Sequence, residues 1–165
     1  MAITAWSALW FLPFALPICI WVAWNDMKFM KIPNKAVLAL IVVFLVVGLI
    51  AITPLADYPW RLLHFVVILA VGFVANMIGA VGAGDAKFAA AMAPLVAFGD
   101  LQVVLFLFAT VLLAAFVTHR LFKLIPPFRA RTTDWASWTH NDFPMGLTLA
   151  GTLIFYLCLG AVFGA

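Results

Sequence analysis

Long uninterrupted apolar runs dominate this sequence, and their lengths limit the folds that the chain can adopt. Residues 36–52 read AVLALIVVFLVVGLIAI, without one charged side chain. A helix needs about 20 apolar residues to cross the hydrocarbon layer of a membrane. Strands of a membrane barrel would instead alternate apolar and polar residues at period two. These runs do not alternate, so they predict an all-α fold of transmembrane helices.

The composition agrees, because 68% of the residues are hydrophobic and only 9% are charged, whereas about a quarter are charged in a soluble domain. We expect one membrane-embedded domain over residues 1–165, a polytopic bundle of about six spans. The predicted spans are 6–24, 36–53, 61–79, 87–99, 101–118 and 145–163. The fourth is short and contains Pro94, so we expect it to be tilted, kinked or partly shielded by its neighbours.

The distribution of lysine and arginine predicts the orientation of the bundle. With six spans, the connections after the first, third and fifth lie on the same side. They hold Lys28, Lys31, Lys35, Lys87, Arg120, Lys123, Arg129 and Arg131, and only Arg61 falls on the other side. Basic residues concentrate on the cytoplasmic side of a membrane. Asp26 and Asp85 are therefore predicted to be cytoplasmic, with both termini outside. The net charge of +3 reflects this topology and does not indicate a nucleic-acid partner.

The longest polar connection, residues 119–146, is basic at its start and contains Trp135 and Trp138. Tryptophan is enriched at the level of the lipid headgroups. Anchoring to membrane lipid is therefore the expected role of these two side chains. A flap that docks the substrate is the alternative.

All six acidic residues are aspartates. Four of them are expected to be solvated loop residues: Asp57, Asp100, Asp134 and Asp142. Asp26 and Asp85 differ because each adjoins the end of an apolar span. Structural roles are available to both, since Lys28 or Lys31 could balance Asp26 and Asp85 could cap the fourth span.

Short motifs surround both aspartates. Pro33 cannot continue the preceding helix, and Asn34 can cap the next one. Gly82 and Gly84 permit positive φ and the close approach of another backbone. Residues 81–87 (VGAGDAK) match neither a phosphate-binding loop nor a dinucleotide-binding motif. Lys87 can be a cytoplasmic anchor or a charge that tunes the nearby carboxylates.

The two aspartates are more informative as a pair. Two spans separate them, so both carboxylates return to the same face of the membrane. Two carboxylates held close at a low-dielectric boundary tend to share one proton. The ionised one can take a proton from water while the protonated one polarises a carbonyl. Such a pair hydrolyses a peptide bond without serine, cysteine, metal or cofactor. The chain has no CxxC pair, which argues against a structural zinc site.

The residues WNDMKFMKIPNK (24–35) followed by GAGDAK resemble the type IV prepilin leader peptidases, a branch of the GxGD membrane aspartic proteases. The resemblance implies that Asp26 and Asp85 are catalytic. Pro33, Asn34, Gly82, Gly84 and Lys87 fill the supporting motif positions. FPMG (143–146), with Pro144 and Gly146, is similar to the motif that opens the last span of the family, and Met145 departs from its aromatic residue.

Larger members of this family carry a soluble insert with paired CxxC motifs and also methylate the new N-terminus. This chain lacks that insert, so it most resembles the short, peptidase-only branch that serves Flp (tight-adherence) pili. The resemblance implies a multi-pass protein of the bacterial inner membrane. Its partner would be a prepilin whose short basic leader is cut on the cytoplasmic side, just ahead of a hydrophobic helix. The sequence leaves open which prepilin is cut, which aspartate is protonated, how the substrate enters, and the oligomeric state.

Two other functions are compatible with the sequence. Carboxylates at the membrane edge also serve proton relays, so a proton-coupled transporter subunit is one alternative. Against it, no predicted span carries a charge near its middle, where carriers bind their substrates. A non-catalytic scaffold for pilus assembly is the other, in which both aspartates would act only as helix caps.

Overall fold

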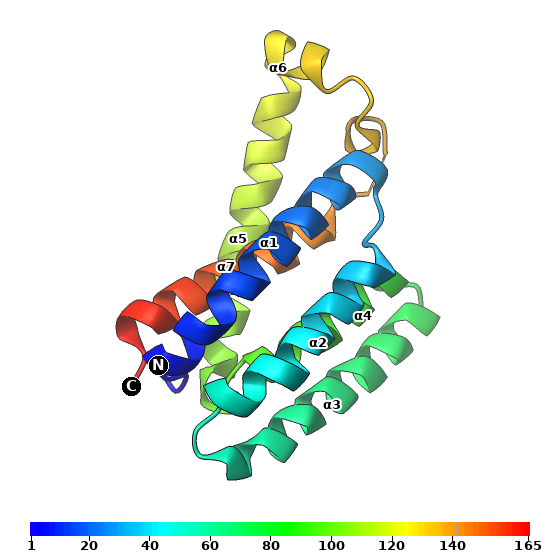
Figure 1. The fold of residues 1–165 in the computed structure, drawn as a ribbon. Helices are drawn as coiled ribbons and strands as arrows, with labels where there is room; N and C mark the ends of the chain where they lie inside the picture. Colours follow the sequence, from blue (N-terminus) through cyan, green and yellow to red (C-terminus); the bar gives the residue numbers. More distant parts are fainter. Residues whose placement is uncertain (141) are drawn as a thin grey trace.

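A computed structural model describes residues 1–140 and 142–165, and every regular element in these ranges is helical (Figure 1). The α-helices are α1 (Ala5–Phe29), α2 (Asn34–Ala51), α3 (Tyr58–Met77), α4 (Ala83–Met92), α5 (Leu101–Lys123), α6 (Pro126–Arg131) and α7 (Met145–Phe163). The 3-10 turns are η1 (Leu55–Asp57), η2 (Ala93–Leu95), η3 (Phe98–Asp100) and η4 (Ala136–Trp138). The predicted all-α bundle is confirmed.

Five of these helical segments are long and apolar enough to cross a membrane. The exception is the predicted fourth span, 87–99. There α4 begins earlier, at Ala83, and ends at Met92, where a 3-10 turn containing Pro94 replaces it. Ten residues of helix are about 15 Å long, half the thickness of the hydrocarbon layer. Phe88 and Leu95 are fully buried. The fourth segment is therefore short, broken near its proline and shielded by its neighbours.

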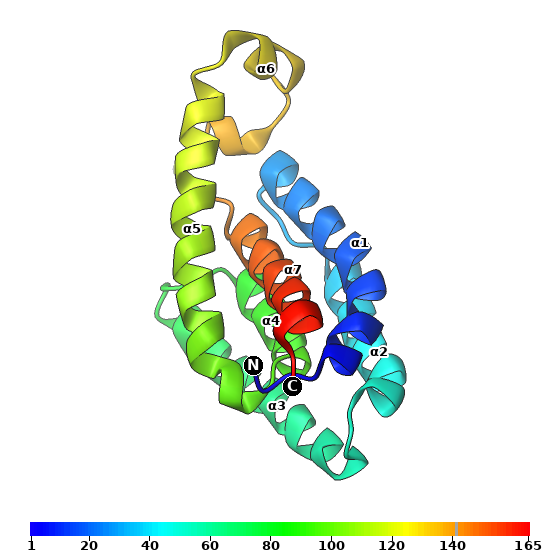
Figure 2. The ribbon, with the colours of Figure 1, turned by 90° about the vertical axis from the view of Figure 1, so that its left-hand side faces the viewer.

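The core lies where α1, α2, α4 and α7 meet. Phe11, Phe44, Leu153 and Tyr156 are among its largest fully buried side chains. In contrast, α3 has no buried residue and α5 has only His119. These two helices flank the bundle and turn apolar side chains outward, as expected where lipid is the solvent. Figure 2 shows α5 reaching beyond the ends of its neighbours and carrying α6.

The two ends of the chain lie side by side at the end of the bundle opposite the α1–α2 turn (Figures 1 and 2). The amino group of Met1 donates a hydrogen bond to the carbonyl of Phe163 over 3.4 Å. This agrees with the prediction that both termini share one face. Their location outside the cell stays a prediction.

Asp100 corrects one expectation, because it is not a solvated loop residue. Only 2% of it is exposed. Its carboxylate accepts hydrogen bonds from the amides of Ala2 and Ile3, at 2.7 and 2.8 Å, and from the hydroxyl of Tyr156, at 2.9 Å. Asp100 thus joins the N-terminal segment, the start of α5 and α7. The partners come from distant parts of the chain, so no local pattern revealed them.

Replacing Asp100 with alanine is expected to lower the stability of the bundle, because three donors, two of them in buried hydrogen bonds, would lose their acceptor. A buried donor left unpaired costs about 1 to 3 kcal/mol. The check is the thermal unfolding midpoint in detergent micelles, with Asp57→Ala as the control, since Asp57 is exposed and accepts no side-chain hydrogen bond in the described ranges. Equal midpoints for the two variants would contradict this role.

Candidate active site

Asp26 lies in the last turn of α1 and is only 5% exposed. The helix ends just after it, because Met30 adopts a left-handed conformation with φ 52°. The Asp26 carboxylate accepts a hydrogen bond of 2.6 Å from the amide of Gly146. A residue 120 positions away therefore fixes this side chain, at the junction of α1 and α7.

Gly146 is the second residue of α7, and Pro144 precedes the helix in an extended conformation. The first amides of a helix have no partner within it and carry partial positive charge, so they bind carboxylates. A methyl group built on Gly146 would lie 2.9 Å from Oδ2 of Asp26 and 3.0 Å from its Cβ. The absence of a side chain at this position is what lets α7 approach Asp26. The structure thus brings two of the predicted supporting residues, Pro144 and Gly146, to the end of α1.

Asp85 is the third residue of α4, and Gly82 precedes the helix as its N-cap. The prediction that Asp85 caps the helix is wrong by three positions. Neither glycine uses the positive φ that it permits, because the φ of Gly82 is −64° and Gly84 is helical. The glycines instead provide space. A Cβ on Gly82 would lie 2.6 Å from Oδ2 of Asp85, and one on Gly84 would lie 3.4 Å from the Cβ of Ile32.

The contact between Gly84 and Ile32 brings the IPN motif against the start of α4. Pro33 is the N-cap of α2 in an extended conformation, and Asn34 is the first helical residue. The expectation that Asn34 caps this helix is wrong, because the N-cap is Pro33, which makes no side-chain capping hydrogen bond. Residues 32–34 instead form the turn between α1 and α2, and Ile32 lies against Gly84 at the start of α4.

The two carboxylates lie close enough to affect each other. Burial, and then the negative charge of Asp26, raise the pKa of Asp85 to about 6. Asp85 precedes the predicted fourth span and lies outside the five long spans. This coupling is the behaviour expected of a carboxylate pair at a low-dielectric boundary. Within the described ranges, no three histidine, cysteine, aspartate or glutamate side chains gather as a possible metal site.

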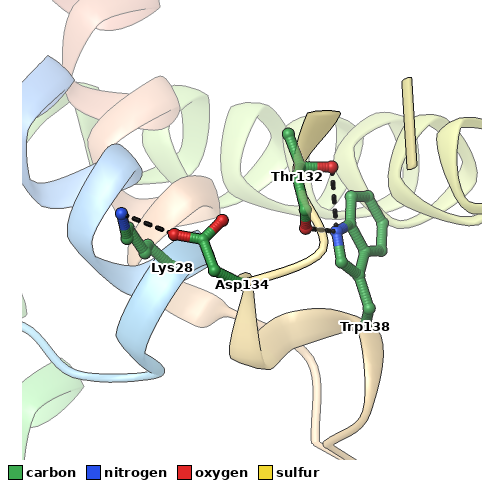
Figure 3. A network of polar contacts seen from close by, with 4 residues as sticks. All are labelled: Lys28, Thr132, Asp134 and Trp138. Carbon is green, nitrogen blue, oxygen red and sulfur yellow. Dashed lines mark hydrogen bonds and ion pairs between the residues drawn. The ribbon is translucent and has the colours of Figure 1, made fainter. Parts of the chain in front are cut away.

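Neither nearby lysine in α1 or α4 neutralises the pair. Lys28 forms an ion pair of 2.7 Å with Asp134 (Figure 3), and its hydrogen bond lowers the pKa of that loop carboxyl. The expectation that Lys28 or Lys31 balances Asp26 is therefore not met, because Lys31 also forms no ion pair among the described residues. Lys87 is exposed and is in no ion pair of the described residues. The pair keeps its mutual repulsion, which favours sharing one proton.

The part of the loop after α5 that contains Trp135 and Trp138 packs against protein. Trp138 is only 4% exposed, and its indole donates hydrogen bonds to the carbonyl and the hydroxyl of Thr132, at 2.9 and 3.1 Å (Figure 3). Trp135 stacks on Trp138 with centroids 5.7 Å apart and meets Trp24 of α1 edge to face at 5.3 Å. The lipid-anchor interpretation of Trp138 is thus wrong, because its ring is enclosed by protein.

The fold and the site define a polytopic helical membrane protein in which two separate segments bring a pair of aspartates together at one end of the bundle. The sequence matches the family model of the type IV leader peptidase family over residues 3–119. The match covers both aspartates, so this chain belongs to that family. Gly146 and the start of α7 lie beyond the matched range. Comparisons with curated proteins and with solved structures gave no match.

Proposed function

We propose that this protein is a membrane aspartic endopeptidase that removes the short leader from Flp-type prepilins at the cytoplasmic face of the bacterial inner membrane. Membership of the leader peptidase family supports the reaction class. The observation that carries the aspartic mechanism is the influence of the buried Asp26 carboxylate on Asp85. Eight of the nine lysines and arginines are predicted from the sequence on the same side as Asp26 and Asp85, which supports the cytoplasmic orientation.

The hydrogen bonds divide the two roles between the aspartates. The amide of Gly146 donates to Asp26, and an N–H donor to a carboxylate favours its ionised form. Within the described ranges, no donor is bonded to the side chain of Asp85. We assign the base to Asp26 and the shared proton to Asp85. The pair still titrates as a unit.

The proposed reaction starts with a water molecule between the two side chains. Asp26 accepts one proton from the water, and the hydroxide oxygen forms a bond to the scissile carbonyl carbon. Asp85 donates its proton toward the carbonyl oxygen and stabilises the developing charge. The C–N bond then breaks. The proton held by Asp26 passes to the leaving amine, and the proton from the carbonyl oxygen returns to Asp85. The products are the leader carboxylic acid and the new N-terminus.

The raised pKa of Asp85 predicts how the rate of leader removal depends on pH. Its pKa is raised to about 6, so it holds the catalytic proton below that pH and loses it above. The value of kcat/KM is therefore expected to fall by about tenfold for each pH unit above 6. The measurement is kcat/KM for leader removal on both sides of pH 6. An activity that rises through pH 6 would contradict the role of Asp85 as acid.

The function is tested by reconstituting the protein in lipid vesicles with a Flp-type prepilin and measuring the mass of the product. Loss of the leader is expected, and chelators and reagents directed at serine or cysteine should leave the rate unchanged. An intact prepilin under all conditions, with the protein correctly inserted, would contradict the proposal. Strong inhibition by a chelator would contradict the aspartic mechanism.

A further inference from the structure

A cavity of about 780 Å³ lies between α1, α5 and α7, and Phe128, Trp135 and Trp138 of the segment after α5 also line it. We call it the α1–α5–α7 groove. Its walls include Ala23 and Met27 of α1, Ala114 and His119 of α5, and Leu147 and Gly151 of α7. Nearly all of its lining is hydrocarbon, and the three helices are long and apolar enough to cross a membrane. The groove is as large as the cavities that bind substrates in other proteins.

His119 is the one buried residue of α5. Its ring is 5% exposed, stacks on Trp138 at 4.7 Å and meets Phe143 edge to face at 5.8 Å. Among the residues that the structure describes, neither Nδ1 nor Nε2 has a hydrogen-bond partner. Buried polar groups are nearly always paired, because leaving one unpaired is costly. A neutral imidazole has one donor and one acceptor, so the ring is suited to the main chain of a bound peptide.

The groove adjoins the candidate active site through residues next to it in the chain, and neither aspartate lines the groove. Met27 follows Asp26 in the chain, and Leu147 follows Gly146, whose amide binds the Asp26 carboxylate. Phe143 touches His119 and lies three residues before that same glycine. A peptide that passes from Asp26 into the membrane therefore has an apolar path beside it, with His119 near the entrance.

The chemistry of the lining selects the occupant. A peptide segment inside a membrane must satisfy its own backbone hydrogen bonds, so it enters as a helix with apolar side chains. Ala114 is small and exposed, and small residues let a second helix approach closely. A lipid acyl chain would match the walls, but its ester carbonyl can only accept a hydrogen bond, whereas a peptide main chain offers His119 both a donor and an acceptor.

We propose that the α1–α5–α7 groove binds the apolar helix of the substrate that follows the scissile bond, and that His119 hydrogen-bonds the main chain between that helix and the cut. This inference rests on the proposed peptidase function. The Lys28–Asp134 ion pair joins the loop after α5 to α1, and the Trp138–Thr132 hydrogen bonds hold Trp138 of that loop in the lining of the groove (Figure 3). The leader, on the cytoplasmic side of the cut, stays outside the groove.

Two substitutions test the two parts of the inference. Ala114→Trp fills the groove, and Ala109→Trp is the matched control, because Ala109 is an exposed residue of the same helix that lines neither large cavity. We expect kcat/KM for a prepilin with its complete apolar helix to fall at least about tenfold in Ala114→Trp and to change less than about twofold in the control. His119→Phe keeps the stacked ring but removes both nitrogens, so KM should rise about tenfold while kcat stays within about twofold.

The location is tested separately from the rates. The Asp85→Asn variant is mixed with a Flp-type prepilin that carries a benzoylphenylalanine photocrosslinker at successive positions of its apolar helix. Crosslinks to α1, α5 and α7 residues of the groove are expected. Crosslinks confined to α3, or to lipid, would overturn the inference, and so would unchanged kinetics in both Ala114→Trp and His119→Phe. A wild-type protein that cleaves no prepilin would instead refute the proposed function, so the two failures are distinguishable.

Discussion

Replacing Asp26 with asparagine is expected to abolish leader removal, and replacing Asp85 with asparagine is expected to do the same. Asparagine keeps the size of the side chain but can neither accept the proton of the attacking water nor hold a transferable one. General acid–base groups contribute about 10²- to 10⁴-fold to a rate. Each single variant should therefore lose at least about 10³-fold in kcat. The measurement is the fraction of prepilin processed per unit time at equal amounts of inserted enzyme.

The control for these variants is Asp142→Asn, because Asp142 carries an 85% exposed side chain in the loop before α7. It should process prepilin at the wild-type rate. The double variant Asp26→Asn/Asp85→Asn should be no slower than either single one, since the two groups act as a unit. Retained cleavage in either single variant would contradict a carboxylate pair. Loss of both variants from the membrane would favour the scaffold interpretation.

The second large effect is expected at Gly146, where a replacement by alanine should lower kcat about 100-fold. The added methyl group would meet Asp26 within 3.0 Å, so either the carboxylate or the start of α7 must move, and the 2.6 Å hydrogen bond is lost. Misplacing a catalytic group by about 1 Å can cost about 10²-fold in rate. Gly146 lies in the second position of α7, a good place for alanine, so the helix itself should tolerate the change.

Gly48→Ala is the control for this experiment. Its methyl group would lie 3.0 Å from the ring of Tyr58, equally crowded but in α2 and against a side chain that can move. It should leave kcat unchanged. For Gly146→Ala we expect the loss in kcat with KM within about threefold, since the substrate-binding residues are untouched. An equal fall in both variants, or an effect on protein abundance alone, would indicate a packing role for Gly146.

The parts of this protein that follow from composition and chain order could be predicted from the sequence. Apolar runs show where helices cross the membrane, and the even number of spans between Asp26 and Asp85 places both at one end. The broken fourth segment also followed, because Pro94 interrupts a run too short to span. Each of these conclusions depends on local chemistry or on counting along the chain.

The parts that depend on contacts between distant residues could not be predicted. Asp100 looked like a loop aspartate because its partners, Ala2, Ile3 and Tyr156, lie at the other ends of the chain. Asp134 was expected only to be solvated, and its ion pair with Lys28 joins the loop to α1. For His119 the available signal was a histidine directly after the predicted span 101–118. Its neighbours Trp138 and Phe143 come from the loop after it, so the groove appears only when that loop is folded back.

The close approach of the two aspartates in the membrane is the claim on which the account depends, and it can be measured by crosslinking. Asp26→Cys and Asp85→Cys are combined in a chain whose native Cys19 and Cys158 are replaced by alanine, and a short thiol crosslinker is applied to intact membranes. The pair Asp26→Cys/Asp57→Cys is the control, since Asp57 lies at the other end of the bundle. We expect efficient crosslinking between the cysteines at positions 26 and 85, and no crosslinking between those at positions 26 and 57. Failure of the first pair to crosslink, with both thiols reactive toward a single-ended reagent, would contradict a shared catalytic site.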